Sequence, residues 1–190
     1  MIIYLARHTE YDNPRNISPF HLPVHLSIEG REKAKRMGNW FKENAKSSTP
    51  IISSPIARCV QTSEIISSVS NSFVTFDDRL FETMCPNLQG TVEKEFEGWK
   101  FAQDDPSRES QSDILKRVLN LYNEVVEKGA DRIFVSHGDP LTILWFHLTG
   151  KKIEHYLWSP QNSIHNIQRG DIVKISVENS NVQDTEYIKV

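Results

Sequence analysis

Apolar and polar residues follow one another along the chain in blocks that are typical of alternating strands and helices. Five short runs rich in β-branched residues predict strands, at Ile2–Ala6, Pro50–Ser53, Ser72–Phe76, Arg132–Ser136 and Asp171–Val177. A sixth run, Thr185–Val190, predicts an edge strand. Between the runs, apolar residues recur at the spacing of amphipathic helices, over Ser27–Asn44, Pro55–Val69, Ser112–Lys128 and Asp139–Leu148. This order predicts a three-layer α/β sandwich, a mostly parallel sheet with helices on both faces.

Two of the predicted helices have a marked start. In the stretch SSPIARC, Ser54 is expected to cap the helix and Pro55 to take its first position. Asp139 and Pro140 repeat this arrangement in the stretch SHGDPLT. Each of these predicted helices begins directly after a predicted strand.

The segment Thr83–Gln111 has no single hydrophobic period and is rich in proline, glycine and charged residues. We expect it to form a lid-like insertion over the end of the sheet, with a short helix around Thr91–Phe101. A chain of 190 residues with 38% apolar content is long enough for one sizeable core. We therefore expect a single domain over residues 1–190.

Charge and cysteine content narrow the class of protein. The net charge is −3 and no block of basic residues occurs, which argues against nucleic acid as a partner. The two cysteines, Cys59 and Cys85, lie far apart and indicate neither a disulfide framework nor a thiolate metal site. No stretch approaches the roughly 20 apolar residues that span a bilayer. These features predict a cytoplasmic protein that does not associate with membranes.

Histidines, arginines and one glutamate stand close to the ends of predicted strands. Arg7 and His8 end the first strand, and Arg58 lies on the first turn after the second. Glu82 follows the third strand by a short loop, and His137 ends the fourth. In an open α/β sheet, ligands bind beyond the carboxyl ends of the strands. Each residue alone has an ordinary structural explanation, but together they are expected to converge on one rim.

This set of side chains suits phosphoryl transfer without a metal ion. Arg7 and Arg58 can neutralise the oxygens of a phosphate, and His137 can donate a further hydrogen bond. His8 is then the nucleophile, with a backbone carbonyl holding the proton on its other ring nitrogen. Glu82 would protonate the leaving oxygen and later activate water, which requires a raised pKa.

At these residues the sequence resembles the histidine phosphatase superfamily, also called phosphoglycerate mutase-like. Arg7-His8 matches the first two letters of the family's Arg-His-Gly motif, and the second histidine is matched at His137 in SHGD. The other matching motifs, in the family's own order, are LSIEG at Leu26–Gly30, SPIARCVQT around Arg58, LFE ending at Glu82, and Glu109-Ser110. The resemblance implies a phosphoglycerate mutase-like fold and a phosphohistidine intermediate on His8.

The chain departs from the family pattern after the first motif. Thr9 replaces the usual glycine and adds a hydroxyl beside the expected phosphate pocket. We expect Thr9 either to hydrogen-bond the phosphoryl group or to crowd it. The segment that follows aligns poorly with the family, and Arg15 and Asn16 are expected only as possible substrate contacts.

Several functions remain open at this stage. The favoured function is hydrolysis of a small phosphorylated substrate, with a phosphoprotein as an alternative substrate. A phosphoglycerate mutase-type phosphotransferase and a non-catalytic phospho-ligand-binding module are the two other candidates. We expect no cofactor. We also expect no metal ion, because Pro23 breaks the helix in which His21 and His25 could form a metal-binding pair. The oligomeric state is left open.

Overall fold

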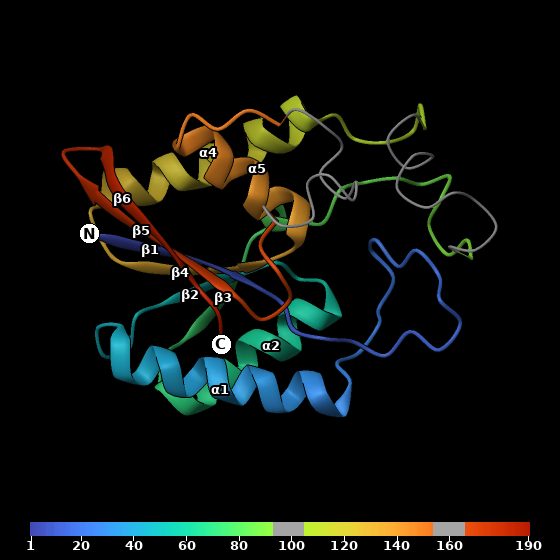
Figure 1. Cartoon of the computed structure of the whole chain (residues 1–190), viewed down its shortest axis with the longest axis horizontal. Coiled ribbons are helices and arrows are strands. Elements are labelled where there is room, and N and C mark those ends of the chain that lie inside the picture. Colours follow the sequence, from blue (N-terminus) through green and yellow to red (C-terminus); the bar gives the residue numbers. More distant parts are fainter. Residues whose placement is uncertain (93–104, 154–165) are drawn as a thin grey trace.

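A computed structural model describes residues 1–92, 105–153 and 166–190 of the chain. In these residues, six strands form one sheet in the order β3-β2-β4-β1-β5-β6 (Figure 1). The strands are β1 (Ile2–Arg7), β2 (Ile51–Ser53), β3 (Val74–Phe76), β4 (Arg132–Ser136), β5 (Ile172–Glu178) and β6 (Asn181–Ile188). The helices are α1 (Ile28–Asn44), α2 (Ala57–Ser70), α4 (Gln111–Lys128), α5 (Gly138–Leu148) and the short 3₁₀ helix η1 (Asp78–Leu80).

The sheet has a parallel part and an antiparallel part. Strand β4 pairs in parallel with β1 and β2, and β2 pairs in parallel with β3. Strands β5 and β6 run antiparallel on the other side of β1. The four parallel strands therefore place their carboxyl ends at the same edge of the sheet.

Alternating side chains of β1 divide the core into two layers. Ile3 and Leu5 pack with residues of α4 and α5 on one face, whereas Tyr4 and Ala6 pack with α1 and α2 on the other. Figure 1 shows the two helix pairs on opposite sides of the sheet. The predicted three-layer α/β class with a mostly parallel sheet is confirmed. None of the described helices is long and apolar enough to cross a membrane.

Both predicted helix caps are wrong. Helix α2 begins at Ala57, after an N-cap residue, Ile56, that makes no side-chain capping bond. The hydroxyl of Ser54 instead lies 2.9 Å from a ring nitrogen of His137. Helix α5 begins at Gly138, so that Asp139 lies inside the first turn with its carboxylate bound to other side chains. In both cases the side chain that was predicted to cap the helix binds side chains of other segments instead.

The C-terminal hairpin is longer than predicted. Strand β6 begins at Asn181, four residues before the predicted start, and pairs with β5 along its length. The turn residues Asn179 and Ser180 have φ values of 50° and 63°, and tight hairpin turns need two consecutive positive φ values. This turn was not predicted, because the turn contains no glycine. The predicted short helix around Thr91–Phe101 lies mostly outside the described residues.

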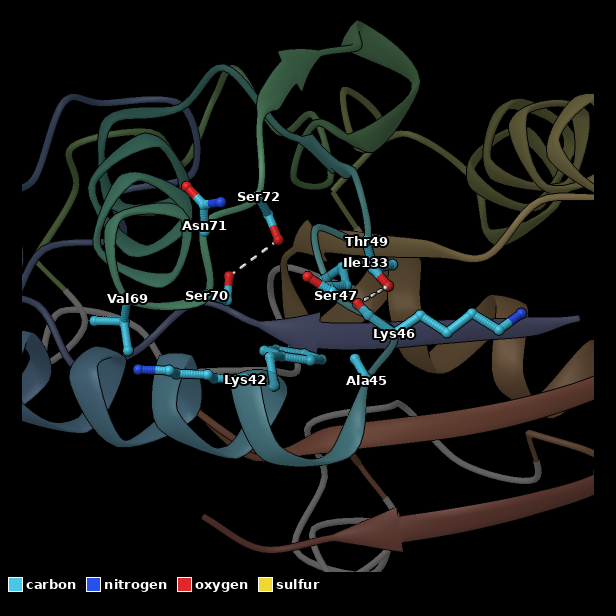
Figure 2. A pocket seen from close by; sticks show the side chains of 11 residues that line it. Lys42, Ala45, Lys46, Ser47, Thr49, Val69, Ser70, Asn71, Ser72 and Ile133 are labelled. Atoms are coloured by element: carbon cyan, nitrogen blue, oxygen red, sulfur yellow. Dashed lines mark hydrogen bonds between the residues drawn. The ribbon is translucent and has the colours of Figure 1, made fainter.

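A pocket of about 250 Å³ opens at the amino edge of the sheet, between the ends of α1 and α2 (Figure 2). Its polar side chains bond to near neighbours in the chain. Ser70 donates to the hydroxyl of Ser72, and Thr49 donates to the carbonyl of Lys46. This pocket lies at the edge opposite the carboxyl ends of the parallel strands.

Candidate active site

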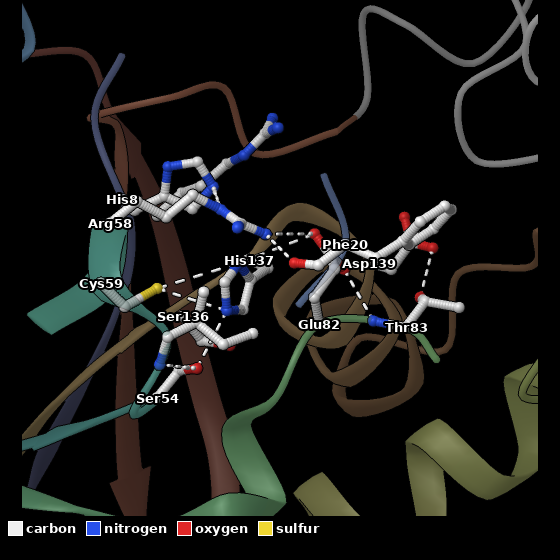
Figure 3. Close-up of polar contacts among 12 residues, drawn as sticks. His8, Phe20, Ser54, Arg58, Cys59, Glu82, Thr83, Ser136, His137 and Asp139 are labelled. Carbon is white, nitrogen blue, oxygen red and sulfur yellow. Dashed lines mark hydrogen bonds and ion pairs between the residues drawn. The ribbon is translucent and has the colours of Figure 1, made fainter. Parts of the chain in front are cut away.

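The five predicted site residues lie at the carboxyl edge of the parallel strands. Arg7 is the last residue of β1 and His8 follows it, while His137 directly follows β4. Arg58 comes from the first turn of α2, and Glu82 comes from the loop after η1. Figure 3 shows four of these side chains, those of His8, Arg58, Glu82 and His137, pointing toward one another. The predicted convergence on one rim is seen in the geometry.

The hydrogen-bond partners of the two ring nitrogens hold His8 in one tautomer. Its Nδ1 lies 2.8 Å from the carbonyl oxygen of Thr9, so Nδ1 carries the proton and donates. Its Nε2 accepts a hydrogen bond of 3.2 Å from Nε of Arg58 and therefore bears the lone pair. Burial, together with the charges of Arg58 and Arg7, holds the pKa of His8 well below its usual range. The ring is a neutral imidazole whose nucleophilic nitrogen faces the site.

Arg58 is almost completely buried and turns its guanidinium group toward the site. Its Nη2 donates to the carbonyl of Phe20 at 2.8 Å and lies 3.8 Å from Oε2 of Glu82. Its Nη1 is buried and has no hydrogen-bond partner among the described residues. Buried donors in native proteins are nearly always satisfied. An anionic ligand beside Nη1 would satisfy this donor.

Arg7 adds a second buried guanidinium group beside the histidines. Its Nη1 donates to the carbonyl of Ile167 at 2.9 Å, which fixes the side chain against the segment before β5. Burial and the nearby charge of Arg169 lower the pKa of Arg7 to about 10, so it stays protonated at neutral pH. Two positive charges, those of Arg7 and Arg58, thus lie close enough to act on both histidines.

Glu82 is the acidic group of the site. Its Oε1 accepts a hydrogen bond of 2.9 Å from the backbone N–H of Thr83, and its Oε2 lies 3.7 Å from Nδ1 of His137. Burial and the charge of Asp139 raise the pKa of Glu82 to about 7, against the opposing effect of Arg58. A substantial fraction of the carboxyl group is therefore protonated near neutral pH, as a general acid needs.

His137 is fully buried between the strand ends. Its Nε2 lies 2.9 Å from the hydroxyl of Ser54 and 3.4 Å from the sulfur of Cys59. The ring centroid lies 5.2 Å from that of His8. Burial and the charge of Arg58 hold the pKa of His137 well below its usual range. A second neutral imidazole therefore lies beside that of His8, with Nδ1 on the side of Glu82.

A family model, described as the histidine phosphatase superfamily (branch 1), matches residues 3–175. The chain belongs to the histidine phosphatase superfamily. Members of this superfamily are phosphatases or mutases, and similar proteins of both kinds are found.

One protein of similar sequence and two solved structures of similar fold show the likeness. A Salmonella paratyphi C protein named "Probable phosphoglycerate mutase GpmB" is 32% identical over 159 residues, which is 75% of this chain and 72% of that protein. YhfR of Bacillus stearothermophilus has a TM-score of 0.79 and 23% identity, over 96% of this chain and 94% of that one. A mycobacterial glucosyl-3-phosphoglycerate phosphatase in complex with VO3 has a TM-score of 0.79 and 20% identity, over 98% of both chains.

Thr9, which stands where the superfamily usually has glycine, turns its side chain toward helix α2. Its hydroxyl lies 3.4 Å from the hydroxyl of Thr62, and its backbone N–H donates to the same oxygen at 3.3 Å. Thr62 itself donates to the carbonyl of Arg58, so Thr9 is the donor in the hydroxyl pair. This bond ties the His8 loop to the helix that carries Arg58. A contact between Thr9 and a phosphoryl group stays a prediction.

The two weaker candidates, Arg15 and Asn16, lie in an exposed turn. The backbone N–H of Asn16 donates to the carbonyl of Asn13, and Asn16 has a φ of 50°. Within the described part of the chain, no hydrogen bond joins either side chain to the five residues at the rim. Their role as substrate contacts stays a prediction.

Sequence reasoning missed several residues that support the site. Ser54 and Asp139 were assigned to helix caps, although both contact the predicted site or its neighbours. Tyr11 was not singled out, yet its ring lies 5.6 Å from that of His8 and 4.4 Å from the guanidinium carbon of Arg169. Ser54 lies 83 positions from His137, and Tyr11 lies 158 positions from Arg169, so no local spacing could have indicated these two contacts.

Proposed function

We propose that this protein is a metal-independent phosphatase that hydrolyses phosphate monoesters through a phosphohistidine intermediate on His8. The observation that carries the proposal is the fixed tautomer of His8. The Thr9 carbonyl holds the proton on Nδ1, and the hydrogen bond that Nε2 accepts from Arg58 shows that Nε2 bears the lone pair. A neutral imidazole with its unprotonated nitrogen beside a buried arginine is the arrangement that attack on phosphorus needs.

In the first step, Nε2 of His8 attacks the phosphorus atom and the bond from phosphorus to the ester oxygen breaks. Glu82 gives its proton to the departing oxygen, so an alcohol leaves and the Glu82 carboxylate remains. The positive charge that develops on the imidazole is stabilised by the hydrogen bond from Nδ1–H to Thr9. Arg7 and Arg58 offset the negative charge of the phosphoryl oxygens.

In the second step, the Glu82 carboxylate takes a proton from a water molecule whose oxygen attacks phosphorus. The bond from phosphorus to Nε2 breaks, and inorganic phosphate and neutral His8 are regenerated. Glu82 is then protonated again for the next cycle. His137 serves in both steps as a neutral hydrogen-bonding group for a phosphoryl oxygen.

A phosphoglycerate mutase-type reaction is the second candidate, and the name of the Salmonella relative favours it. In a mutase, the phosphoryl group on His8 returns to a second hydroxyl of the substrate instead of passing to water. The short, acidic segment Thr83–Gln111 favours hydrolysis, because it suits a carboxylated sugar phosphate poorly. We propose that the substrates are small phosphorylated compounds, with a phosphoprotein as the alternative, and that the protein acts in the cytoplasm.

The test is hydrolysis of an aryl phosphate in the presence of EDTA, compared between the wild type and His8→Ala. We expect activity that survives the chelator and is lost in His8→Ala. The exposed His147 at the end of α5 provides a matched control, and His147→Ala should hydrolyse the ester at the wild-type rate. Activity that disappears with EDTA, or that persists in His8→Ala, would contradict the proposal.

A further inference from the structure

A buried chain of hydrogen bonds leads away from the carboxyl group of Glu82. Its first link is the Thr83 N–H, which donates to Oε1 of Glu82. The Thr83 hydroxyl then donates to Oδ2 of Asp139 at 2.7 Å, and Nη2 of Arg108 donates to the same oxygen at 2.7 Å. Thr83 and Asp139 are 1% and 4% exposed. The chain therefore joins the acid of the site to a buried ion pair, and the Thr83 end of it is visible in Figure 3.

The members of this chain come from three separate parts of the sequence. Thr83 is the neighbour of Glu82, and Asp139 lies in the first turn of α5, two residues after His137. Arg108 lies in the described stretch just before α4, and 92% of its side-chain surface is buried. A buried pair is weakly screened by solvent, and the Asp139 charge acts on Glu82.

Charged groups from every neighbouring element face Glu82. Arg58 of α2 and Arg7 of β1 favour its ionised form, while Asp139 of α5 disfavours it. The His137 ring is neutral and lies 3.7 Å away. The side chains of His21 and Arg117 are directed at the backbone carbonyl of Glu82 rather than at its carboxyl group. Asp139 is thus the acidic neighbour that opposes two arginines.

We propose that Asp139 and Arg108 act together as positioning residues for Glu82, with Asp139 keeping the carboxyl group in its proton-donating form and Arg108 limiting that effect. The inference rests on the proposed role of Glu82 as the general acid. It assigns a function to a pair that makes no direct contact with the carboxyl group. The pair connects the segment before α4 with the acid of the site.

The direction of each effect follows from simple electrostatics. The Asp139 carboxylate repels the ionised form of Glu82 and so raises its pKa, second only to burial. Removing the charge with Asp139→Asn should lower the pKa of Glu82. Arg108→Met leaves the Asp139 charge less compensated and should raise the pKa of Glu82. The two substitutions therefore act in opposite directions.

The test is the pH dependence of kcat/KM for an alkyl phosphate, whose hydrolysis needs the protonated acid. The alkaline limb of the profile should move to lower pH in Asp139→Asn and to higher pH in Arg108→Met, each by on the order of one unit. The double variant should lie between them. Because ionisation of the substrate is the same for every variant, the differences report on the enzyme.

Two controls separate this effect from a loss of structure. Arg108→Lys keeps the charge and should keep the wild-type limb, whereas Arg79→Met breaks a different ion pair, with Asp77, and should leave the limb in place. Shifts of Asp139→Asn and Arg108→Met in the same direction, or no shift in either, would overturn the inference. Asp139→Asn retains an oxygen for the Thr83 hydroxyl, which keeps the packing close to native.

Failure of the inference is distinguishable from failure of the proposed function. If the alkaline limb vanishes in Glu82→Gln but stays fixed in Asp139→Asn and Arg108→Met, Glu82 is the acid and the positioning role is refuted. If the limb persists in Glu82→Gln, the proposed role of Glu82 itself is refuted.

Discussion

The two edges of the sheet differ in what is buried there. At the carboxyl edge, Arg7, Arg58 and His137 bring charged or titratable groups into the interior. At the amino edge, the pocket of Figure 2 is lined by serine and threonine hydroxyls and by two lysines. Lys46 is 78% exposed in its side chain and pairs with the largely buried carboxylate of Asp131. The carboxyl edge therefore buries its cations, whereas Lys46 at the amino edge stays in water.

The two edges also differ in how their polar groups find hydrogen-bond partners. A hydroxyl that donates to a nearby carbonyl is satisfied by the chain itself, as Thr49 is by Lys46. A buried guanidinium group whose Nη1 lacks a partner in the described residues is costly to the fold. The proposed phosphate ester would supply the missing partner of Arg58 and would account for this cost.

The largest expected effect is a loss of rate when the leaving group can no longer be protonated by Glu82. Glu82→Gln should slow hydrolysis of alkyl phosphates by roughly 100- to 1,000-fold. Aryl phosphates should be affected much less, because their leaving groups need little protonation. The measurement is kcat/KM for both ester types with both proteins. Equal losses on alkyl and aryl esters would remove Glu82 from the role of acid.

The next effect compares a buried cation with an exposed one. Arg58→Met should lower kcat/KM by about 100-fold, since it removes charge stabilisation of the phosphoryl group. Lys46→Met in the amino-edge pocket should leave kcat/KM unchanged. If the two variants behave alike in steady-state assays, the contrast between the two edges has no functional meaning.

A third effect concerns stability and pH. The folded-state pKa of Glu82 is about 7, whereas a glutamate in an unfolded chain titrates near ~4.3. Between these values the folded state binds more protons than the unfolded state, so the free energy of unfolding falls as pH rises. Glu82→Gln should gain stability over the wild type across this window and match it below it. Urea titrations at pH values spanning the window test this, and a constant difference at all pH values would contradict it.

The smallest effect is expected at the amino-edge pocket itself. Asn71 ends helix α2 in the left-handed region, with a φ of 56°. Alanine tolerates this conformation less well, so Asn71→Ala should lower the free energy of unfolding by about 1 kcal/mol. Phosphatase activity should not change. Asn71→Gly is the matched control, because glycine adopts this conformation without strain. A loss of kcat in Asn71→Ala at full folding would show that the two edges are coupled.

The sequence predicted the strands and the rim of the site because both depend on local pattern and on one topological rule. Strand Arg132–Ser136 was predicted with its exact bounds, since its apolar run is short and has a histidine at its end. Parallel strands share a carboxyl edge, and this brought His8 and His137 together in the prediction. The same rule predicted Arg58 and Glu82 at this rim, because each follows a parallel strand, and the family motifs agreed with it.

The supporting residues could not be predicted because their partners are distant in sequence. Ser54 lies 83 positions from His137, and Arg108 lies 31 positions from Asp139. A serine or aspartate before an apolar helix satisfies the capping pattern equally well whether or not a tertiary partner competes for it. The side-chain direction of Thr9 likewise depends on Thr62, which belongs to another element.

The most direct test of the central claim is capture of the covalent intermediate. The wild type and His8→Ala would be mixed with an aryl phosphate, quenched in alkali within one turnover, and mapped by mass spectrometry. The account predicts one phosphoryl group, located on the peptide that contains His8 and missing from His8→Ala. A phosphoryl group on another residue, or hydrolysis by the wild type with no phosphorylated peptide under single-turnover conditions, would contradict it.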